Sequence, residues 1–260
     1  MAQPLPRIRS LLITRPAGLA EGLAEGLRAI GVAPVILPLI EIAPPPEPAQ
    51  LAALLPRLPE CQWAIFVSPS AVRMGLAAVH EHLGVFPESV RLAAVGEGSA
   101  RPLREALGRP VLIPAEGADS EGLLACPELQ ALAGQSVMLF RGAGGRTLIA
   151  DTLAARGAAV MHAVCYERRP LRPDTAPLLA DWPDAISVTS TEILDQLVQV
   201  MGVERGTEGL LQATPLFVPH PRIAAAARAH GLRDVRLTGP GDAGLIAALS
   251  ALAALPSSGN

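Results

Sequence analysis

The chain has 260 residues, half of them hydrophobic, which is enough apolar material for one large or two ordinary folded cores. Its formal net charge of −3 argues against a nucleic-acid-binding protein, because such domains are usually basic. All 21 basic residues are arginine, and the absence of lysine excludes a lysine Schiff base, a pyridoxal phosphate enzyme and a Walker-type phosphate loop.

Strand and helix patterns alternate from the start of the chain. A strand is expected at 8–14 and a helix at 19–30, which stops at Gly31. A second strand at 34–38 runs into the proline-rich stretch LIEIAPPPEP. Because proline cannot donate a hydrogen bond to a sheet, this stretch is predicted to be a linker.

Eight further strands follow on either side of a second proline-rich break, RRPLRPDTAP at 168–177. Five precede the break, at 63–67, 92–95, 110–113, 136–140 and 159–165, with helices expected at 70–79, 99–107 and 147–156. Three follow it, at 185–188, 215–218 and 235–237, each with a helix behind it. Alternating strands and helices predict parallel sheets covered on both faces.

The strand count favours an α/β fold made of two flavodoxin-like, doubly wound parallel-sheet domains. One domain is discontinuous, 1–40 with 169–260, and it holds an inserted domain at 44–164. Two adjacent crossings at 39–43 and 164–168 are expected to link the domains and to act as hinges around a cleft. In such sheets ligands bind outside the carboxyl ends of the strands.

Hydroxyl groups, arginines and glycines gather at the predicted carboxyl ends. Each Ser or Thr there can be a helix N-cap, and this role is compatible with ligand binding because a helix N-terminus also attracts anions. Arginine suits two-pronged carboxylate recognition, although Arg141 or Arg146 can instead pair with a nearby acid. The candidates for binding a carboxylate-rich ligand are Thr14, Arg15, Ser68, Ser70, Ser99, Arg141, Gly142, Ser190 and Arg222.

Other chemistries are disfavoured. No metal site is expected, because no residue cluster has zinc-ligand spacing. Cys61, Cys126 and Cys165 are widely spaced, so we expect buried reduced thiols in a cytoplasmic protein. The apolar runs are too short for a signal peptide or a membrane span.

An ordered set of motifs resembles the uroporphyrinogen-III synthase family. It opens with LLITRPAGLAEGLAEGLRAIGVAPVILPLIEIAP and continues with FVSPSAV, VGEGSARPL, SEGLL, LFRGAGGRTLIADTLAARGAAV, YERRP, VTSTEIL and HPRIAAAARAHGL. The resemblance covers nearly the whole chain and implies two flavodoxin-like domains joined by a two-stranded linker. The chain departs from the usual family residues at Val67, Ser70, Ser99 and the pair Arg222-Ile223.

The resemblance implies cofactor-free cyclisation of hydroxymethylbilane to uroporphyrinogen III with loss of water, a lyase reaction of haem biosynthesis. Ring A loses its hydroxyl group and becomes an azafulvene cation, which attacks the substituted carbon of ring D. The resulting spiro intermediate fragments and recloses with ring D inverted. The expected partner is this small molecule, with hydroxymethylbilane synthase as a candidate for transient handover, and the chain is expected to be a monomer.

Tyr166, the only tyrosine, is the candidate general acid, because it stands where the second crossing leaves the inserted domain. Departure of hydroxide from a pyrrolic carbinol needs only modest assistance, so a phenol with an ordinary pKa of about 10 can supply it. The alternative is a linker tyrosine packed across the hinge with its hydroxyl in water. The alternative function is a non-catalytic two-domain binding protein or sensor for an anionic ligand. A tetrapyrrole-pathway regulator with a synthase-like domain is disfavoured, because we expect no room in the chain for an appended DNA-binding module.

Overall fold

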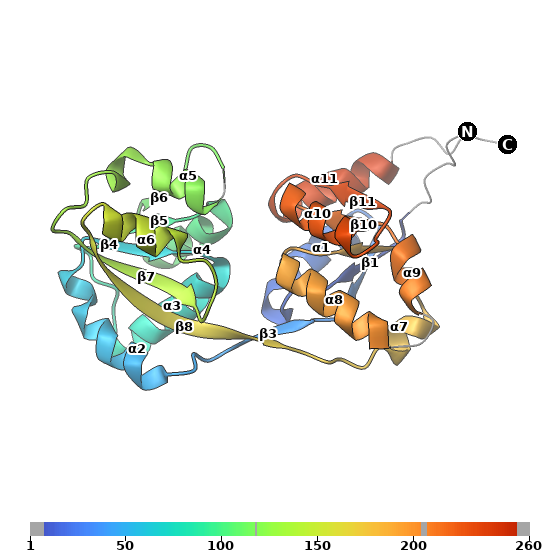
Figure 1. Cartoon of the computed structure of the whole chain (residues 1–260), viewed down its shortest axis with the longest axis horizontal. Coiled ribbons are helices and arrows are strands. Elements are labelled where there is room, and N and C mark those ends of the chain that lie inside the picture. The colour runs from blue at the N-terminus through green and yellow to red at the C-terminus, as the bar shows by residue number, and fades with distance from the viewer. Residues whose placement is uncertain (1–7, 118, 204–206, 254–260) are drawn as a thin grey trace. The chain divides into compact units, whose positions relative to one another are not determined.

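The computed structural model describes residues 8–117, 119–203 and 207–253, and the chain divides into two compact units. Unit 1 contains the described residues up to Glu41 together with those from Arg169 onward, and unit 2 is Ile42–Arg168 (Figure 1). The first division lies inside the predicted crossing 39–43, and the second lies at the end of the predicted crossing 164–168. The outer ends of the predicted discontinuous domain, 1–7 and 254–260, lie outside the described residues.

Unit 1 contains a five-stranded sheet in the order β11-β10-β9-β1-β2, and all its paired strands are parallel. This is the flavodoxin-type order, in which the direction of winding reverses between β1 and β9. The strands are β1 (Ser10–Ile13), β2 (Ala33–Ile36), β9 (Ala185–Ser187), β10 (Leu216–Val218) and β11 (Val235–Leu237).

Helices cover both faces of this sheet, because its strands are short apolar runs that need burial on each side. One face packs against α1 (Glu21–Ala29), which the short 3-10 helix η1 (Ala17–Leu19) precedes, and against α11 (Gly241–Ala253). The other face packs against α7 (Ala176–Ala180), α8 (Thr191–Val203), α9 (Thr207–Ala213) and α10 (Pro221–Ala229). In β1 the side chains alternate accordingly, since Leu11 and Ile13 join the first core and Leu12 joins the second.

Unit 2 is built around a six-stranded sheet in the order β3-β8-β7-β4-β5-β6. Its pairs from β8 to β6 are parallel, and the winding reverses between β4 and β7, as in the other common doubly wound order. The strands are β3 (Ile40–Ala43), β4 (Trp63–Phe66), β5 (Arg91–Ala94), β6 (Val111–Leu112), β7 (Ser136–Gly142) and β8 (Ala159–Pro170).

Two helix layers cover the sheet of unit 2 as well. The first layer, with the larger core, contains α2 (Pro48–Leu54), η2 (Leu55–Glu60), α3 (Pro69–Leu83) and α4 (Glu97–Leu107). The second contains α5 (Ser120–Ala125), η3 (Pro127–Leu129) and α6 (Leu148–Ala155). The predicted doubly wound α/β fold class is therefore confirmed.

The two proline-rich stretches correct the prediction in detail. Ile40–Ala43 form the edge strand β3, which pairs with β8, so the predicted crossing at 39–43 is a strand and not an irregular linker, and β8 continues to Pro170, inside the second predicted break. The sheet of unit 2 thus has six strands instead of the predicted five. Proline is tolerated here because Pro44 follows β3 and Pro170 is the last residue of β8, where a missing N–H removes no ladder bond.

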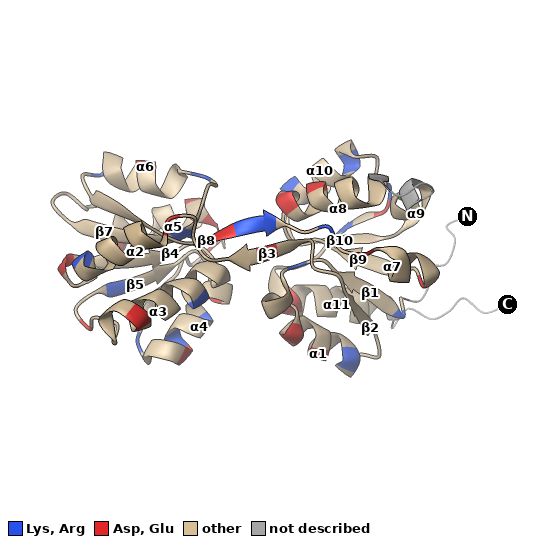
Figure 2. Cartoon of the chain, turned by 90° about the horizontal axis from the view of Figure 1, so that it is seen from below, with Lys and Arg blue, Asp and Glu red and all other residues tan. Residues whose placement is uncertain are grey.

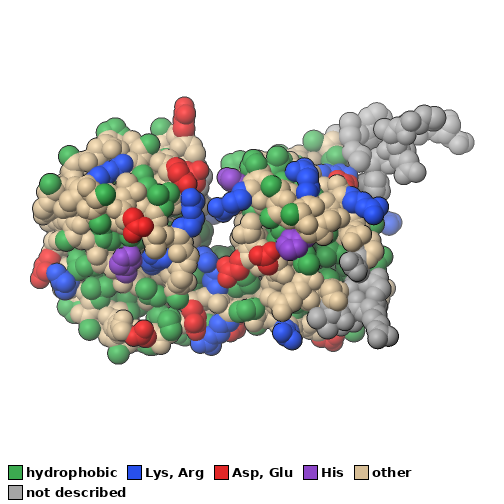
Figure 3. Space-filling view, viewed as in Figure 1, with side chains coloured by type: hydrophobic (Ala, Val, Ile, Leu, Met, Phe, Trp, Pro, Cys, Tyr) green, Lys and Arg blue, Asp and Glu red, His purple; other side chains and the backbone are tan. Residues whose placement is uncertain are grey.

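The surface is mixed in character. Figure 3 shows side chains of both charge signs interspersed with hydrophobic ones over each unit. The large exposed hydrophobic residues are Ile36, Val85, Leu179, Leu210 and Leu237, which are scattered along the chain. In the described part of the chain, no helix combines the length and the apolar character needed to cross a bilayer.

Candidate active site

A β-bulge in β8 sets the direction of Tyr166. Arg141 of β7 pairs with Val164, but the next residue, Gly142, pairs with Tyr166, so Cys165 is an extra residue in β8. Before the bulge the side chains alternate, with Met161 packed on the α3-side core. A regular strand would turn Tyr166 away from the face that Cys165 occupies. The bulge instead places both in the α3-side core, at the carboxyl edge of the sheet.

The hydroxyl group of Tyr166 lies in a small hydrogen-bond network. Tyr166 Oη and Ser68 Oγ share a hydrogen bond of 3.0 Å, and Arg168 Nη2 donates to Tyr166 Oη over 3.1 Å. The Arg168 guanidinium also lies 5.5 Å from the centre of the tyrosine ring. Tyr166 is only 1% exposed, so the alternative that its hydroxyl stands in water is wrong.

Ser68 serves the tyrosine and a helix at once. It is the N-cap of α3 in extended conformation, and its Oγ accepts a bond of 3.0 Å from the N–H of Ala71. Pro69 follows at the first helical position, where its missing N–H costs nothing. The strand end, the cap and the tyrosine hydroxyl are therefore fixed relative to one another.

The N-cap interpretation holds for some of the predicted hydroxyl residues and not for others. Ser190 accepts a bond of 3.2 Å from the N–H of Ile193 at the start of α8, so Ser68 and Ser190 are confirmed as caps. Ser70 and Ser99 are not caps, because they lie inside the first turns of α3 and α4, where they are 5% and 2% exposed. Both serines are therefore close to a helix N-terminus, but neither occupies the N-cap position.

Arg141 and Gly142 end β7 beside Tyr166. Arg141 donates to the carbonyl oxygens of Gly142, over 3.3 Å, and of Gly144, which holds the turn after β7. The expected pairing with an acid is found instead at Arg146, whose Nη2 lies 2.6 Å from Glu121 Oε1. Arg141 therefore shapes the loop that flanks the tyrosine.

The candidates in unit 1 mark the edge where β1 and β9 end. Thr14 is 1% exposed, and its Oγ1 donates to Ser187 O over 2.7 Å, which joins the two strands at the reversal point rather than capping a helix. Arg15 pairs with Asp242 of α11 at 2.8 Å and donates to Leu19 O over 3.1 Å. The charge of Arg15 is thus already compensated.

Arg222 differs from Arg15 because its side chain is exposed at the start of α10. Its backbone N–H donates to His220 Nδ1 over 3.1 Å, so His220 is the N-cap of this helix. Among the described residues no acidic partner of the Arg222 guanidinium is recorded. This arginine is therefore the candidate best placed to meet an anion from solvent.

From the sequence, Arg168 is a neighbour of Tyr166 that could hold substrate carboxylates or solvate the linker, but its contact with the tyrosine hydroxyl was missed, and so was the partner of Thr14. Arg168 follows Tyr166 by two positions on the same strand, and residues two apart share a face, so the spacing could have indicated the contact. Figure 2 shows the end of β8 coloured as basic, where Arg168 and Arg169 lie. Ser187 lies next to Thr14, and no sequence signal indicates that its carbonyl receives the threonine hydroxyl.

The thiols and the nearby histidine have altered pKa values. Burial raises the pKa of Cys165 to about 12 and that of Cys61 to about 11, so neither is a nucleophile at neutral pH. Partial burial, followed by repulsion from Arg141, lowers the pKa of His162. In the described ranges no group of three or more His, Cys, Asp or Glu residues could hold a metal ion.

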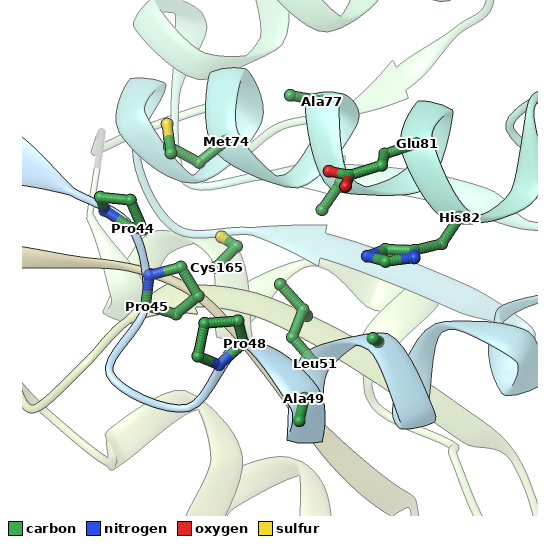
Figure 4. Close-up of a pocket in the computed structure, with 12 residues that line it drawn as sticks. Pro44, Pro45, Pro48, Ala49, Leu51, Met74, Ala77, Glu81, His82 and Cys165 are labelled. Carbon is green, nitrogen blue, oxygen red and sulfur yellow. The ribbon is translucent and has the colours of Figure 1, made fainter.

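Two hollows flank α2 in unit 2, but they do not contain the candidate residues. The first, of about 440 Å³, lies between α2 and α3 and has Pro45, Met74 and Cys165 among its mostly apolar walls (Figure 4). The second, of about 430 Å³, lies between α2 and β8 and includes Gln50 and His162. The network around Tyr166 is thus separate from both.

Comparisons with known proteins identify the family of the chain. The family model described as uroporphyrinogen-III synthase HemD matches residues 21–246. The chain belongs to the uroporphyrinogen-III synthase family. It is 35% identical over 237 residues to the uroporphyrinogen-III synthase of Escherichia coli K12, an alignment that covers 90% of this chain and 96% of the relative. It is 30% identical over 210 residues to the synthase of Synechococcus elongatus, with 77% of each chain covered.

Solved structures of uroporphyrinogen-III synthases share the fold. A mutant uroporphyrinogen III synthase from Thermus thermophilus superposes with a TM-score of 0.59 at 20% identity, covering 95% of this chain and 96% of the other. The Helicobacter pylori 26695 uroporphyrinogen-III synthetase superposes with a TM-score of 0.57 at 17% identity, covering 94% and 99%. At these identities the similarity supports the fold alone.

Proposed function

We propose that the chain is a cyclising lyase that converts hydroxymethylbilane to uroporphyrinogen III with inversion of ring D and loss of water. Membership of the synthase family carries this proposal. The hydrogen-bonded Tyr166 hydroxyl at the carboxyl edge of unit 2 supplies a group that can assist the first step. Uroporphyrinogen III is a precursor in haem biosynthesis, which places the enzyme in that pathway.

In the proposed mechanism, the substrate displaces the side chains that cover the buried Tyr166 hydroxyl, which then donates its phenolic proton to the departing hydroxyl group of ring A. The C–O bond breaks, water leaves, and the pyrrole carries the positive charge as an azafulvene cation. Arg168, 3.1 Å from Tyr166 Oη, stabilises the negative charge that develops on the phenol oxygen. Ser68 Oγ at 3.0 Å can orient the hydroxyl before transfer. The proton released when ring D closes for the second time restores the phenol.

The remaining candidates are proposed to bind carboxylates or to shape the edge that does so. Arg222 offers a guanidinium, and the N-termini of α3, α4 and α8, near Ser70, Ser99 and Ser190, offer the positive ends of helix dipoles. Thr14 and Arg15 are engaged with protein partners, so we assign them to holding the β1 and β9 edge. We assign Arg141 and Gly142 to shaping the site. Arg141 bonds to the loop after β7, and Gly142 lies against the ring of Tyr166.

We further propose that the enzyme needs no cofactor and works as a monomer in the cytoplasm. Its substrate can close without an enzyme to the uninverted isomer, so rapid receipt from hydroxymethylbilane synthase would be useful. Transient handover between the two enzymes is therefore part of the proposal.

The decisive experiment uses freshly made hydroxymethylbilane. After incubation with the chain, the products are oxidised to porphyrins and separated by chromatography into isomers. We expect isomer III to predominate, whereas an enzyme-free control gives isomer I. An isomer ratio equal to the control would contradict the enzymatic function. If the chain also bound hydroxymethylbilane in that case, it would be a binding protein or sensor.

A further inference from the structure

The ring of Tyr166 lies directly over Gly142. A Cβ atom added at Gly142 would stand 2.6 Å from Cζ, 2.7 Å from Cε2 and 3.0 Å from Oη of this tyrosine. Carbon atoms in contact prefer a separation of about 3.5–4.0 Å, so the ring would have to retreat by about 1 Å. No side chain larger than hydrogen fits at this position while the ring stays in place.

The backbone pairing between β7 and β8 also fixes the position of this ring. The bulge at Cys165 sets Tyr166 opposite Gly142, and Ala143 N–H donates to Tyr166 O over 2.7 Å. Cys165 Sγ in turn donates to Arg141 O over 3.4 Å. The end of β7 therefore determines both where the tyrosine backbone runs and how closely its ring approaches the strand.

The position of the ring decides whether its hydroxyl reaches its partners. Tyr166 Oη lies 3.0 Å from Ser68 and 3.1 Å from Arg168, which are already ordinary hydrogen-bond lengths. A displacement of about 1 Å would bring at least one of these beyond hydrogen-bond range. Only a glycine opposite the bulge lets the hydroxyl keep both bonds.

We propose that Gly142 is a positioning residue for Tyr166, which acts by leaving space for the ring and not by touching the substrate. Together with the bulge at Cys165, it holds the phenol hydroxyl against Ser68 and Arg168. The catalytic importance of this placement rests on the function proposed above for Tyr166. The placement itself can be measured without any substrate.

The first test follows the tyrosine directly. Because the chain contains one tyrosine, ring-labelled tyrosine gives a single site in an NMR spectrum. Gly142→Ala should move this resonance in the absence of ligand. Gly22→Ala is the matched control, since Gly22 lies in α1 in unit 1 with no atom within 4 Å of an added Cβ, and it should leave the resonance in place. An unmoved resonance in Gly142→Ala would overturn the proposal.

The second test is a double-mutant cycle with Tyr166→Phe. Gly142→Ala should lower kcat by about tenfold or more when Tyr166 is present and by less than about twofold in the Tyr166→Phe background. Its effect on melting temperature should be similar in both backgrounds, because phenylalanine keeps the ring that the new methyl group meets. Equal losses of kcat in the two backgrounds would mean that Gly142 acts without Tyr166, and the proposal would be wrong.

Two further outcomes can be distinguished from a failure of the proposal. If Gly142→Ala does not fold, Tyr166→Leu in the same chain should restore folding by removing the ring, and failure to do so would contradict the proposal. If the resonance moves but Tyr166→Phe has normal kcat, Gly142 still positions Tyr166. In that case the catalytic role of the tyrosine, and not its placement, would be refuted.

Discussion

Tyr166 is a buried phenol whose oxygen has two partners of different kinds. Arg168 can only donate to it, which leaves the phenolic proton free to point toward Ser68 or toward another acceptor. A leaving hydroxyl group is such an acceptor. The arrangement therefore suits a group that gives its proton away and then has its negative charge stabilised by a neighbouring guanidinium.

Replacing Tyr166 by phenylalanine tests this role at the scale of one atom. The ring remains over Gly142, so we expect KM to stay near wild type and stability to fall by only about 1 kcal/mol, the worth of a typical hydrogen bond. The value of kcat should fall at least about tenfold, which corresponds to about 1.4 kcal/mol of lost transition-state stabilisation. Steady-state kinetics with thermal denaturation give both numbers. A kcat within about twofold of wild type would remove Tyr166 from the mechanism.

Two helix caps offer a comparison at the scale of secondary-structure elements. Ser68 caps α3 and Ser190 caps α8, each after a strand at the reversal point of its sheet, but only Ser68 contacts Tyr166. Alanine at either position should cost about 1 kcal/mol of stability, or roughly 2–4 °C in melting temperature. Ser68→Ala should also lower kcat severalfold, whereas Ser190→Ala should act on KM alone. Equal kcat values in the two variants would show that the bond to Tyr166 has no catalytic role.

Most of the strands were predictable, because the sequence of a buried parallel strand is an unbroken apolar run. LLI in β1, WAIF in β4 and VMLF in β7 could be read directly from the sequence. The edge strand β3 could not, since IEIA is followed by prolines and, among the described residues, its only partner in the sheet is β8. The bulge at Cys165 was also hidden, because it results from the register of two strands and not from a turn motif.

For the candidate site, the sequence predicted several of the residues but not the role of each. Strand ends pointed to Ser68, Gly142 and Tyr166, which the structure brings together within unit 2. Their individual roles depended on geometry that spacing does not contain. No pattern in the chain indicates that Asp242, more than 200 positions away, compensates Arg15, or that the hydroxyl of Thr14 bonds to a neighbouring strand.

At the scale of the whole molecule, charge presents a difficulty for the proposed substrate. The chain has a net charge of −3, so its overall field repels a carboxylate-rich molecule. All its positive side-chain charge at neutral pH is guanidinium, which is suited to bidentate contacts at short range. Binding must therefore rely on arginines that lack internal partners, and two of the three predicted ones, Arg15 and Arg141, have such partners.

The sign of the salt dependence of KM can distinguish local attraction from overall repulsion. If exposed arginines such as Arg222 bind substrate carboxylates, KM should rise as salt is increased from about 20 to about 300 mM, because the attraction is screened. Arg222→Gln should raise KM at low salt and flatten this rise, with kcat unchanged. Arg146→Gln is the matched control, since Arg146 is exposed but paired with Glu121, and its KM should follow wild type at every salt concentration. A wild-type KM that falls with added salt would mean that the net charge dominates and that backbone N–H groups, rather than arginines, hold the carboxylates.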